Sequence, residues 1–470
     1  MVFLFLKWPL VAGLSLGSPN RNRDAAWNVV GSESVARFSE PVAHAAAHGM
    51  LSARRAERQS LTYRRSASAG MLGRSRRVAA ECSQVPEVQV SPMQFRDVVL
   101  AGIGVTIPEE VWSSDSIEHR LEPLYRRLKL PEGRLSLMSG IDERRVWAQG
   151  TMPSGPSIRS GLAAIASADL NPADVGVLIH ASVCRDFLEP ATASRVHHEM
   201  GLRPDCWVYD VSNACLGVLN GAVQIAGMIQ AGMIRAGVVV GTENSRPLLD
   251  ATIDSLNADE SLTRKTVKPA FASLTIGSGS CAFLVCHRDL CPEGTPIEFA
   301  IAQANTAFHD LCRSDEDTAG AEMRPLMDTD SEALMAEGIA TGAMALDRLL
   351  AESTWSRDSF TRSVCHQVGT RHRAAMLEAM GLPIANDSIT FPVLGNTGSV
   401  ALPLTVAAAI ERGELVPGDR AALLGIGSGI NSIMIASTWG RTPVRGEWSG
   451  LLDSGTPDPA APDPAALATS

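Results

Sequence analysis

Cys215 lies in a turn of small residues, DVSNACLG at 210–217, between an apolar run and a segment with helical character. This placement puts a thiol at the start of a helix, where unpaired backbone N–H groups and the positive end of the helix dipole favour the thiolate. Most cysteines are buried and structural, and the chain contains nine. The position of Cys215 nevertheless predicts a reactive nucleophile.

Three other segments carry groups that complement a nucleophilic thiol. His366 lies in SVCHQV, a strand-like stretch that leads into a helix, and Asn396 lies in LGNTGS, a turn flanked by glycine. The run GIGSG at 425–429 follows an apolar strand, and its missing side chains allow a backbone N–H to approach a ligand. A cysteine, a histidine, an asparagine and an amide-presenting turn are the parts of a thiol acyl-transfer site.

Apolar strand-like runs alternate with small-residue helical patterns along the chain. The predicted strands are 98–105, 175–181, 207–210, 236–242, 280–287, 363–366 and 420–426. The predicted helices are 156–168, 192–200, 216–230, 331–351, 370–380 and 402–412. This alternation favours an α/β fold in which helices cover the sheets. Because a strand, a turn and a helix carry a reactive residue in both halves, we expect a pseudo-duplicated architecture.

Composition divides the chain into four expected segments. Residues 1–92 are rich in Arg, Ser and Ala and show no sustained period, so we expect a disordered N-terminal extension, with Met93 as an alternative start and a transit peptide left open. Residues 93–270 and 271–440 are the two expected halves. Residues 441–470 end in a stretch rich in Pro, Ala and Asp and are expected to form a loose tail.

Composition also excludes several classes of function. Hydrophobic residues make up 45% of the chain and charged residues 20%, which is typical of a soluble globular protein. Residues 1–92 hold 12 of the 41 Lys and Arg but only 6 of the 51 Asp and Glu, so the remainder is too acidic for a nucleic-acid partner. An odd number of cysteines without CxxC spacing argues against a disulfide framework and a metal site. We therefore expect a cytoplasmic protein with no transmembrane segment.

Five short motifs occur in a fixed order along the chain. They are GIDERR at 140–145, NAC at 213–215, VCHQ at 364–367, GNTG at 395–398 and LGIGSG at 424–429. Together they resemble the thiolase superfamily, and within it the 3-oxoacyl-ACP synthase III branch, over about residues 93 to 440. The resemblance implies a five-layer αβαβα fold of two pseudo-duplicated halves, a homodimer and an acyltransferase without a cofactor. It assigns catalysis to Cys215, His366 and Asn396, and the oxyanion hole to the backbone N–H groups of Cys215 and Gly429.

A longer segment carries a narrower resemblance. The stretch ASVCRDFLEPATAS at 181–194, with LLGIGSGIN at 423–431, resembles the head-to-head acyl-CoA condensing enzymes of bacterial olefin biosynthesis. In those enzymes the glutamate of the Leu-Glu-Pro segment crosses the dimer interface and acts as the base for condensation, so the resemblance gives Glu189 that role. The residues alone also fit a surface carboxylate at Glu189 that caps the helix at 192. Cys184 stands where the family has serine, and we expect it to be structural.

The resemblance implies a Claisen condensation of two long-chain acyl-CoA thioesters, through an acyl-cysteine, to a β-keto acid or β-ketoacyl-CoA. Three alternatives stay open: a 3-oxoacyl-ACP synthase III that uses acyl-CoA and malonyl-ACP, a thioesterase, and a non-catalytic thiolase-fold partner subunit. Joining two unactivated acyl-CoA molecules needs a base for the α-proton, whereas a decarboxylating synthase does not. A role for Glu189 as base therefore distinguishes condensation of two acyl-CoA molecules from the reaction of a decarboxylating synthase.

Binding of the substrate's carrier and chain is less well indicated. Arg126, Arg127 and Arg144 are the candidate cations for CoA, although basic residues mostly form solvated surface. The helix after Cys215 carries a series of small residues that could line an acyl channel or serve close packing. They are Gly217, Gly221, Ala222, Ala226 and Gly227.

Overall fold

The computed structural model describes residues 93–314 and 327–448, which belong to one compact unit, Val90–Ser470. The expected N-terminal extension and residues 449–470 of the expected tail lie outside the described residues. Among the described helices, none is both long and apolar enough to cross a membrane.

The first sheet is built mainly from the first half of the chain. Its strands are β2 (Val98–Thr106), β5 (Val175–Ala181), β6 (Trp207–Val211), β7 (Ala236–Glu243), β8 (Gly279–His287) and β16 (Val444–Glu447), and β9 (Thr295–Pro296) pairs with β2. The strand order is β16-β2-β8-β7-β5-β6. β5 runs parallel to both β6 and β7, so the carboxyl ends of these three strands meet at one edge.

The second sheet contains β1 (Met93–Gln94), β10 (Phe299–Ala304), β13 (Arg362–Cys365), β14 (Arg420–Gly427) and β15 (Asn431–Thr438), in the order β1-β10-β15-β14-β13. β13 runs parallel to β14, and the other pairs are antiparallel. β14 and β15 are buried along nearly their whole length, which requires helices or sheet on both faces.

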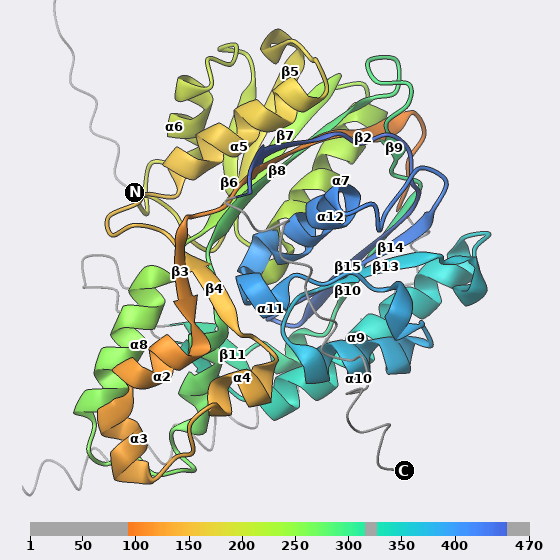
Figure 1. The fold of residues 1–470 in the computed structure, drawn as a ribbon. Helices are drawn as coiled ribbons and strands as arrows, with labels where there is room; N and C mark the ends of the chain where they lie inside the picture. The colour runs from red at the N-terminus through yellow and green to blue at the C-terminus, as the bar shows by residue number, and fades with distance from the viewer. Residues whose placement is uncertain (1–92, 315–326, 449–470) are drawn as a thin grey trace, which may run out of the picture. The chain divides into compact units, whose positions relative to one another are not determined.

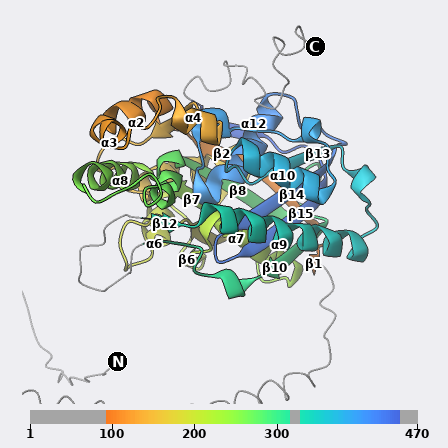
Figure 2. The ribbon, with the colours of Figure 1, turned by 90° about the horizontal axis from the view of Figure 1, so that it is seen from below.

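Helices separate and cover these two sheets (Figures 1 and 2). The helices are α5 (Ser154–Ser167), α6 (Thr192–Glu199), α7 (Gly217–Gln230), α9 (Ser331–Glu352), α10 (Thr370–Met380) and α12 (Ala401–Glu411). α7 and α12 lie between the sheets and share one apolar core with both. A second core joins α9 and α10 to the second sheet, and a third joins α5 and α6 to the first. The expected αβαβα layering is therefore confirmed.

α12 lies in the central layer and is buried on all sides along most of its length. Its first nine residues, ALPLTVAAA, are all buried. A helix that is apolar all round is stable in water only when other elements enclose it, and here sheets lie on both sides. The largest apolar core of the protein therefore passes through the middle of the stack.

A smaller group of elements stands beside the layers. It includes a hairpin of β3 (Glu110–Ser113) and β4 (Glu143–Val146) with the helices α2 (Ser114–Arg120), α3 (Glu122–Leu128), α4 (Arg134–Ser139) and α8 (Arg246–Ala258). The three helices α2, α3 and α8 have their own apolar core, which contains Leu121, Leu124 and Ile253. None of these short elements was among the expected strands and helices.

Two strands differ from the expected division of the chain. β8 begins after residue 270, yet it lies inside the first sheet between β2 and β7. β16 lies in the segment that we expected to be a loose tail, and it pairs with the edge of β2. The expectation of a tail is therefore wrong for residues 444–447, because an open edge of β2 offers this strand a full set of backbone partners.

Candidate active site

Cys215 lies at the junction that the sequence predicts. It follows β6, sits in the short 3-10 helix η2 (Ala214–Leu216) and precedes α7. Ala214 before it has φ of 43°, a left-handed conformation that costs a residue with a side chain about 1 kcal/mol. The chain therefore turns sharply at Ala214 and presents Cys215 at the start of α7.

The glycine run lies directly against this turn. A side chain at Gly427 would approach the backbone nitrogen of Cys215 to 3.6 Å and Leu216 to 3.0 Å. Gly429 has φ of 113°, which only glycine adopts readily. The two segments that the resemblance assigns to the oxyanion hole are thus neighbours, although they come from opposite halves of the chain.

Asparagine side chains join the same two turns. Asn431 donates from Nδ2 to Oδ1 of Asn213, 3.3 Å away, and Asn213 donates from its own Nδ2 to Oδ1 of Asn220 in α7 at 2.9 Å. The first of these bonds links Asn213, two residues before Cys215, to Asn431, two residues after Gly429. The nucleophile and the glycine turn are therefore held in one arrangement.

His366 continues the line of β13 into the site. Its backbone N–H donates to the carbonyl of Leu424 in β14 at 3.0 Å. The residue is buried, and its Nδ1 has no hydrogen-bond partner among the described residues. Burial, with a smaller contribution from His372, lowers the pKa of His366 to about 3. The imidazole is consequently neutral near pH 7.

Asn396 lies in a turn after α11 (Phe391–Leu394). Its backbone pairs with the segment around Thr275 and Gly277 at 2.9 Å on both sides, and its Oδ1 accepts a hydrogen bond of 3.0 Å from the N–H of Gly398. Because the amide oxygen is engaged, Nδ2 is the atom left to donate to a substrate oxygen.

Contacts between elements bring these turns together. η2, which holds Cys215, contacts β14, whose neighbour β13 leads to His366. η2 also contacts η7 (Gly398–Val400), which follows Asn396. The structure thus places the three predicted catalytic residues on segments that meet at one end of α7 and α12.

The surroundings of Cys215 oppose ionisation of its thiol. Burial raises the pKa of the Cys215 thiol to about 12, and the charge of Glu243 contributes in the same direction. The residue as a whole is half-buried. Loss of solvation thus opposes the thiolate that the helix dipole favours at this position.

Glu189 is exposed on the loop between β5 and α6, next to the exposed apolar side chains of Phe187 and Leu188. It does not cap α6, since Asp210 at the end of β6 accepts the N–H groups of Thr192 and Ala193, each at 2.8 Å. The capping role that the residues alone allowed for Glu189 is thus taken by Asp210.

The three candidate arginines have other partners. Arg144 is fully buried and donates to the carbonyls of Trp112 and Leu274 and to Oγ of Ser114, so it is not available to a substrate in this structure. Arg127 donates to three carbonyl groups at the end of α8. Arg126 is exposed and pairs with Glu122 one helical turn away.

The small residues of α7 pack against the first sheet. A side chain at Gly221 would come 2.4 Å from Val239, and one at Gly217 would come 3.0 Å from the carbonyl of Ala181. Close packing therefore accounts for both glycines.

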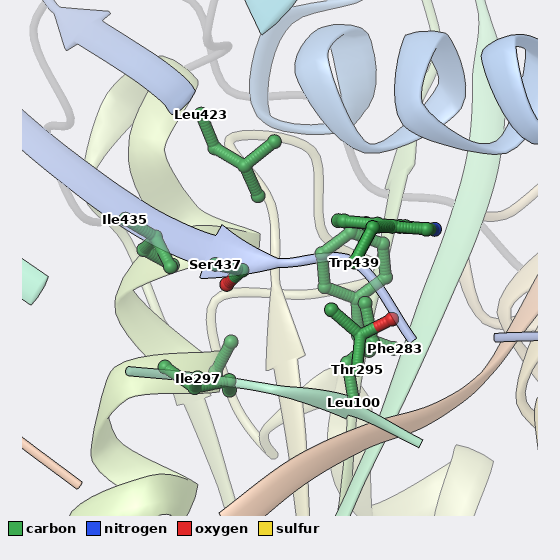
Figure 3. Close-up of a pocket in the computed structure, with 9 residues that line it drawn as sticks. Leu100, Phe283, Thr295, Ile297, Leu423, Ile435, Ser437 and Trp439 are labelled. Atoms are coloured by element: carbon green, nitrogen blue, oxygen red, sulfur yellow. The ribbon is translucent and has the colours of Figure 1, made fainter. Parts of the chain in front are cut away.

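A cavity beside Ala222 has a volume of about 10 Å³ and is lined by Leu100, Phe283, Leu423 and Trp439 among others (Figure 3). This is close to the space of one water molecule, and a site for a drug-sized ligand needs roughly 300–1,000 Å³. In this structure the cavity is far too small for an acyl chain.

Glu243 was not recognised from the sequence. It ends β7, is 5% exposed, and its charge acts on Cys215. The signal in the sequence was a glutamate directly after the apolar run AGVVVGT, at the carboxyl end of a strand where side chains meet the site. Cys184, expected to be structural, exchanges hydrogen bonds with the backbone of Asn244.

This chain is similar in sequence and structure to known proteins. Residues 350–439 match the family model described as 3-oxoacyl-(acyl-carrier-protein) synthase III C terminal. The chain is 36% identical over 351 residues to an acyl-CoA:acyl-CoA alkyltransferase of Shewanella oneidensis, which covers 74% of this chain and 100% of the relative. A protein of the same name from Xanthomonas campestris is 31% identical, with the same coverage.

A solved structure is similar over the same range. It is a cysteine-to-serine variant of Xanthomonas campestris OleA with bound lauric acid and lauroyl-CoA. The TM-score is 0.69 at 31% sequence identity, and the match covers 73% of this chain and 100% of that one.

Proposed function

The chain belongs to the OleA family of acyl-CoA:acyl-CoA alkyltransferases, within the thiolase superfamily, and we propose that it joins two acyl-CoA thioesters head to head through an acyl-cysteine on Cys215. The observation that carries this function is the convergence of a thiol, a neutral imidazole and a free amide donor on touching segments. These groups suit thioester chemistry, in which one acyl group is transferred to sulfur and a second thioester is turned into an enolate.

The first half-reaction forms the acyl-enzyme. The sulfur of Cys215 attacks the carbonyl carbon of an acyl-CoA while its proton passes to the neutral imidazole of His366. The oxyanion is stabilised by the backbone N–H groups of Cys215 and Gly429. When the intermediate collapses, the C–S bond to CoA breaks and the CoA sulfur takes the proton from His366. The imidazole is neutral again and the acyl group is bound to Cys215.

The second half-reaction forms the new C–C bond. A second acyl-CoA places its thioester oxygen near Nδ2 of Asn396 and the ring of His366, and Glu189 removes an α-proton. The α-carbon attacks the acyl-cysteine carbonyl, the C–S bond to Cys215 breaks, and the departing sulfur regains a proton from the Glu189 carboxyl group. The product is a β-ketoacyl-CoA, which hydrolysis converts to a β-keto acid.

The proposed base acts from a partner subunit. Glu189 is exposed in the single chain, beside Phe187 and Leu188, which are 55% and 47% exposed. β6 forms the edge of the first sheet and presents Trp207, also 55% exposed. An apolar loop beside an unpaired strand edge favours pairing with a second copy. In a homodimer built on this surface, the Glu189 carboxylate would lie at the interface, away from bulk water.

A 3-oxoacyl-ACP synthase III is the second candidate, because residues 350–439 match the C-terminal model of that family. Mass spectrometry of the products from purified protein and myristoyl-CoA separates the two functions. We expect a β-keto acid, or the ketone that it forms by losing CO₂, from myristoyl-CoA alone. Product that appears only after malonyl-ACP is added would contradict condensation of two acyl-CoA molecules and favour the synthase.

A further inference from the structure

The carboxylate of Glu243 is enclosed by hydrogen-bond donors. Its Oε1 accepts the N–H of Val183 at 3.1 Å, the hydroxyl of Ser399 at 2.5 Å and the N–H of Ser399 at 3.3 Å. Its Oε2 accepts the N–H of Cys184 at 3.3 Å. All four partners are N–H or O–H groups, so the side chain acts only as an acceptor. Charge-assisted bonds of this kind hold a carboxylate in one orientation.

These bonds join two segments of the candidate active site. Val183 and Cys184 begin the loop that carries Glu189, and Ser399 lies three residues after Asn396. A side chain at Gly398 would lie 3.2 Å from Cδ of Glu243, so the carboxylate also packs against the glycine whose N–H binds Oδ1 of Asn396. Contacts therefore run without a break from the root of the Glu189 loop to the Asn396 amide.

The same carboxylate acts on the nucleophile through space. After burial, the charge of Glu243 is the next largest cause of the raised pKa of Cys215. A negative charge at this position disfavours the thiolate. Because its charge disfavours the thiolate, Glu243 does not assist acylation of Cys215. Its hydrogen bonds to the Glu189 loop and the Asn396 turn instead suit a role in condensation.

We propose that Glu243 is a positioning residue for condensation, whose carboxylate holds the root of the Glu189 loop and the Asn396 turn in register. The base and the oxyanion donor then act on the same thioester. This inference rests on the proposed function, because it takes the roles of Glu189 and Asn396 from there. A displacement of either segment by about 1 Å would cost up to a hundredfold in rate.

The variant Glu243→Gln tests both properties of this side chain. Glutamine keeps the shape but turns an NH₂ group toward backbone donors and removes the charge. We expect acylation of Cys215 to persist, kcat for condensation to fall about tenfold or more, and KM to change less than about twofold. We also expect iodoacetamide to alkylate Cys215 about threefold faster at pH 8, because loss of the negative charge lowers the pKa of the thiol, which increases the thiolate fraction while reducing its nucleophilicity.

Two further variants separate positioning from general structural damage. Glu118→Gln is the matched control, because Glu118 is also buried and accepts backbone N–H groups of Gly133 and Leu135 at 2.7 and 2.6 Å, outside the candidate site. It should leave condensation and alkylation at the wild-type rates. Ser399→Ala removes the 2.5 Å bond and keeps the charge, so it should slow condensation without changing alkylation.

The outcomes are distinct. Wild-type kcat and KM in a folded Glu243→Gln variant would overturn the proposal, as would an equal loss of condensation in Glu118→Gln. If Glu243→Gln does not fold, Ser399→Ala decides, and wild-type condensation by that variant counts against the proposal. A wild-type enzyme that forms no product from acyl-CoA alone would overturn the proposed function instead, and the alkylation rates would still measure the effect of Glu243 on Cys215.

Discussion

Asn431 and Asn213 are 218 positions apart in the sequence, yet Nδ2 of Asn431 donates to Oδ1 of Asn213 across 3.3 Å. One residue follows the glycine turn and the other precedes the nucleophile. The bond therefore sets the spacing between the two backbone N–H groups, of Cys215 and Gly429, that we propose for the oxyanion hole.

The variant Asn431→Ala should loosen this spacing. We expect acylation of Cys215 by myristoyl-CoA to slow by about tenfold, because a single oxyanion donor contributes roughly 10²–10³ to a rate and here the donor is displaced rather than removed. Intact-mass spectrometry over time measures the acyl-enzyme. Asn257→Ala is the control, since that side chain donates to the carbonyl of Arg120 away from the site. Equal acylation rates in the two variants would refute the role of Asn431.

Because the pKa of Cys215 is raised, the rate at which its thiol is alkylated should depend on pH. With a pKa of about 12, the thiol is protonated throughout the neutral range, so the thiolate fraction rises about tenfold for each pH unit. Alkylation of Cys215 by iodoacetamide should therefore keep rising from pH 7 to pH 10, and Cys215→Ser supplies the background. A plateau reached below pH 8 would show instead that the helix dipole dominates and that the resting state is the thiolate.

Two glycines of α7 form a matched pair for a test of packing. Gly221 is buried against Val239, so Gly221→Ala should lower the free energy of unfolding by about 1–3 kcal/mol. Gly227 is exposed and has open space around it, so Gly227→Ala should raise that free energy by about 0.5–1 kcal/mol through better helix propensity. Urea unfolding compares them. A Gly221→Ala protein as stable as Gly227→Ala would mean that α7 does not pack tightly on the first sheet.

Much of the central fold could be predicted from the sequence. Parallel and central strands are buried on both faces, so they appear as continuous apolar runs, and β2, β5, β7, β8 and β14 end within two residues of the predicted limits. β10 and β15 were missed. Only residues 428–430 separate β15 from β14, and the glycine run there was interpreted as a turn that approaches a ligand rather than as a hairpin.

The candidate site was only partly predictable. Short motifs identified Cys215, His366 and Asn396 because each lies at the end of a strand or in a turn that its local sequence specifies. The structure places Arg144 in the interior and Glu243 beside the site, and neither burial nor a long-range hydrogen bond is visible in a local pattern. The same limit applies to the ionisation of Cys215, since desolvation of a thiol depends on tertiary packing.

We propose that Glu189 of one subunit acts in the active site of its partner, and this can be tested by mixing two inactive variants of the chain. Cys215→Ala lacks the nucleophile and Glu189→Gln lacks the base. If Glu189 acts across the interface, a mixed dimer has one complete site, and random pairing should restore about a quarter of the wild-type condensation rate. Each variant expressed alone is the control. Mixed dimers, isolated with two affinity tags, that stay inactive would place the base within its own chain or elsewhere.

The most direct test of the whole account is the fate of myristoyl-CoA on the Glu189→Gln variant, followed by intact-mass spectrometry of the protein together with product analysis. The account predicts an acyl-enzyme on Cys215 that forms normally and accumulates, with condensation reduced at least about a hundredfold because the general base is missing. A Glu189→Gln variant that makes the β-keto product from myristoyl-CoA at the wild-type rate would contradict it.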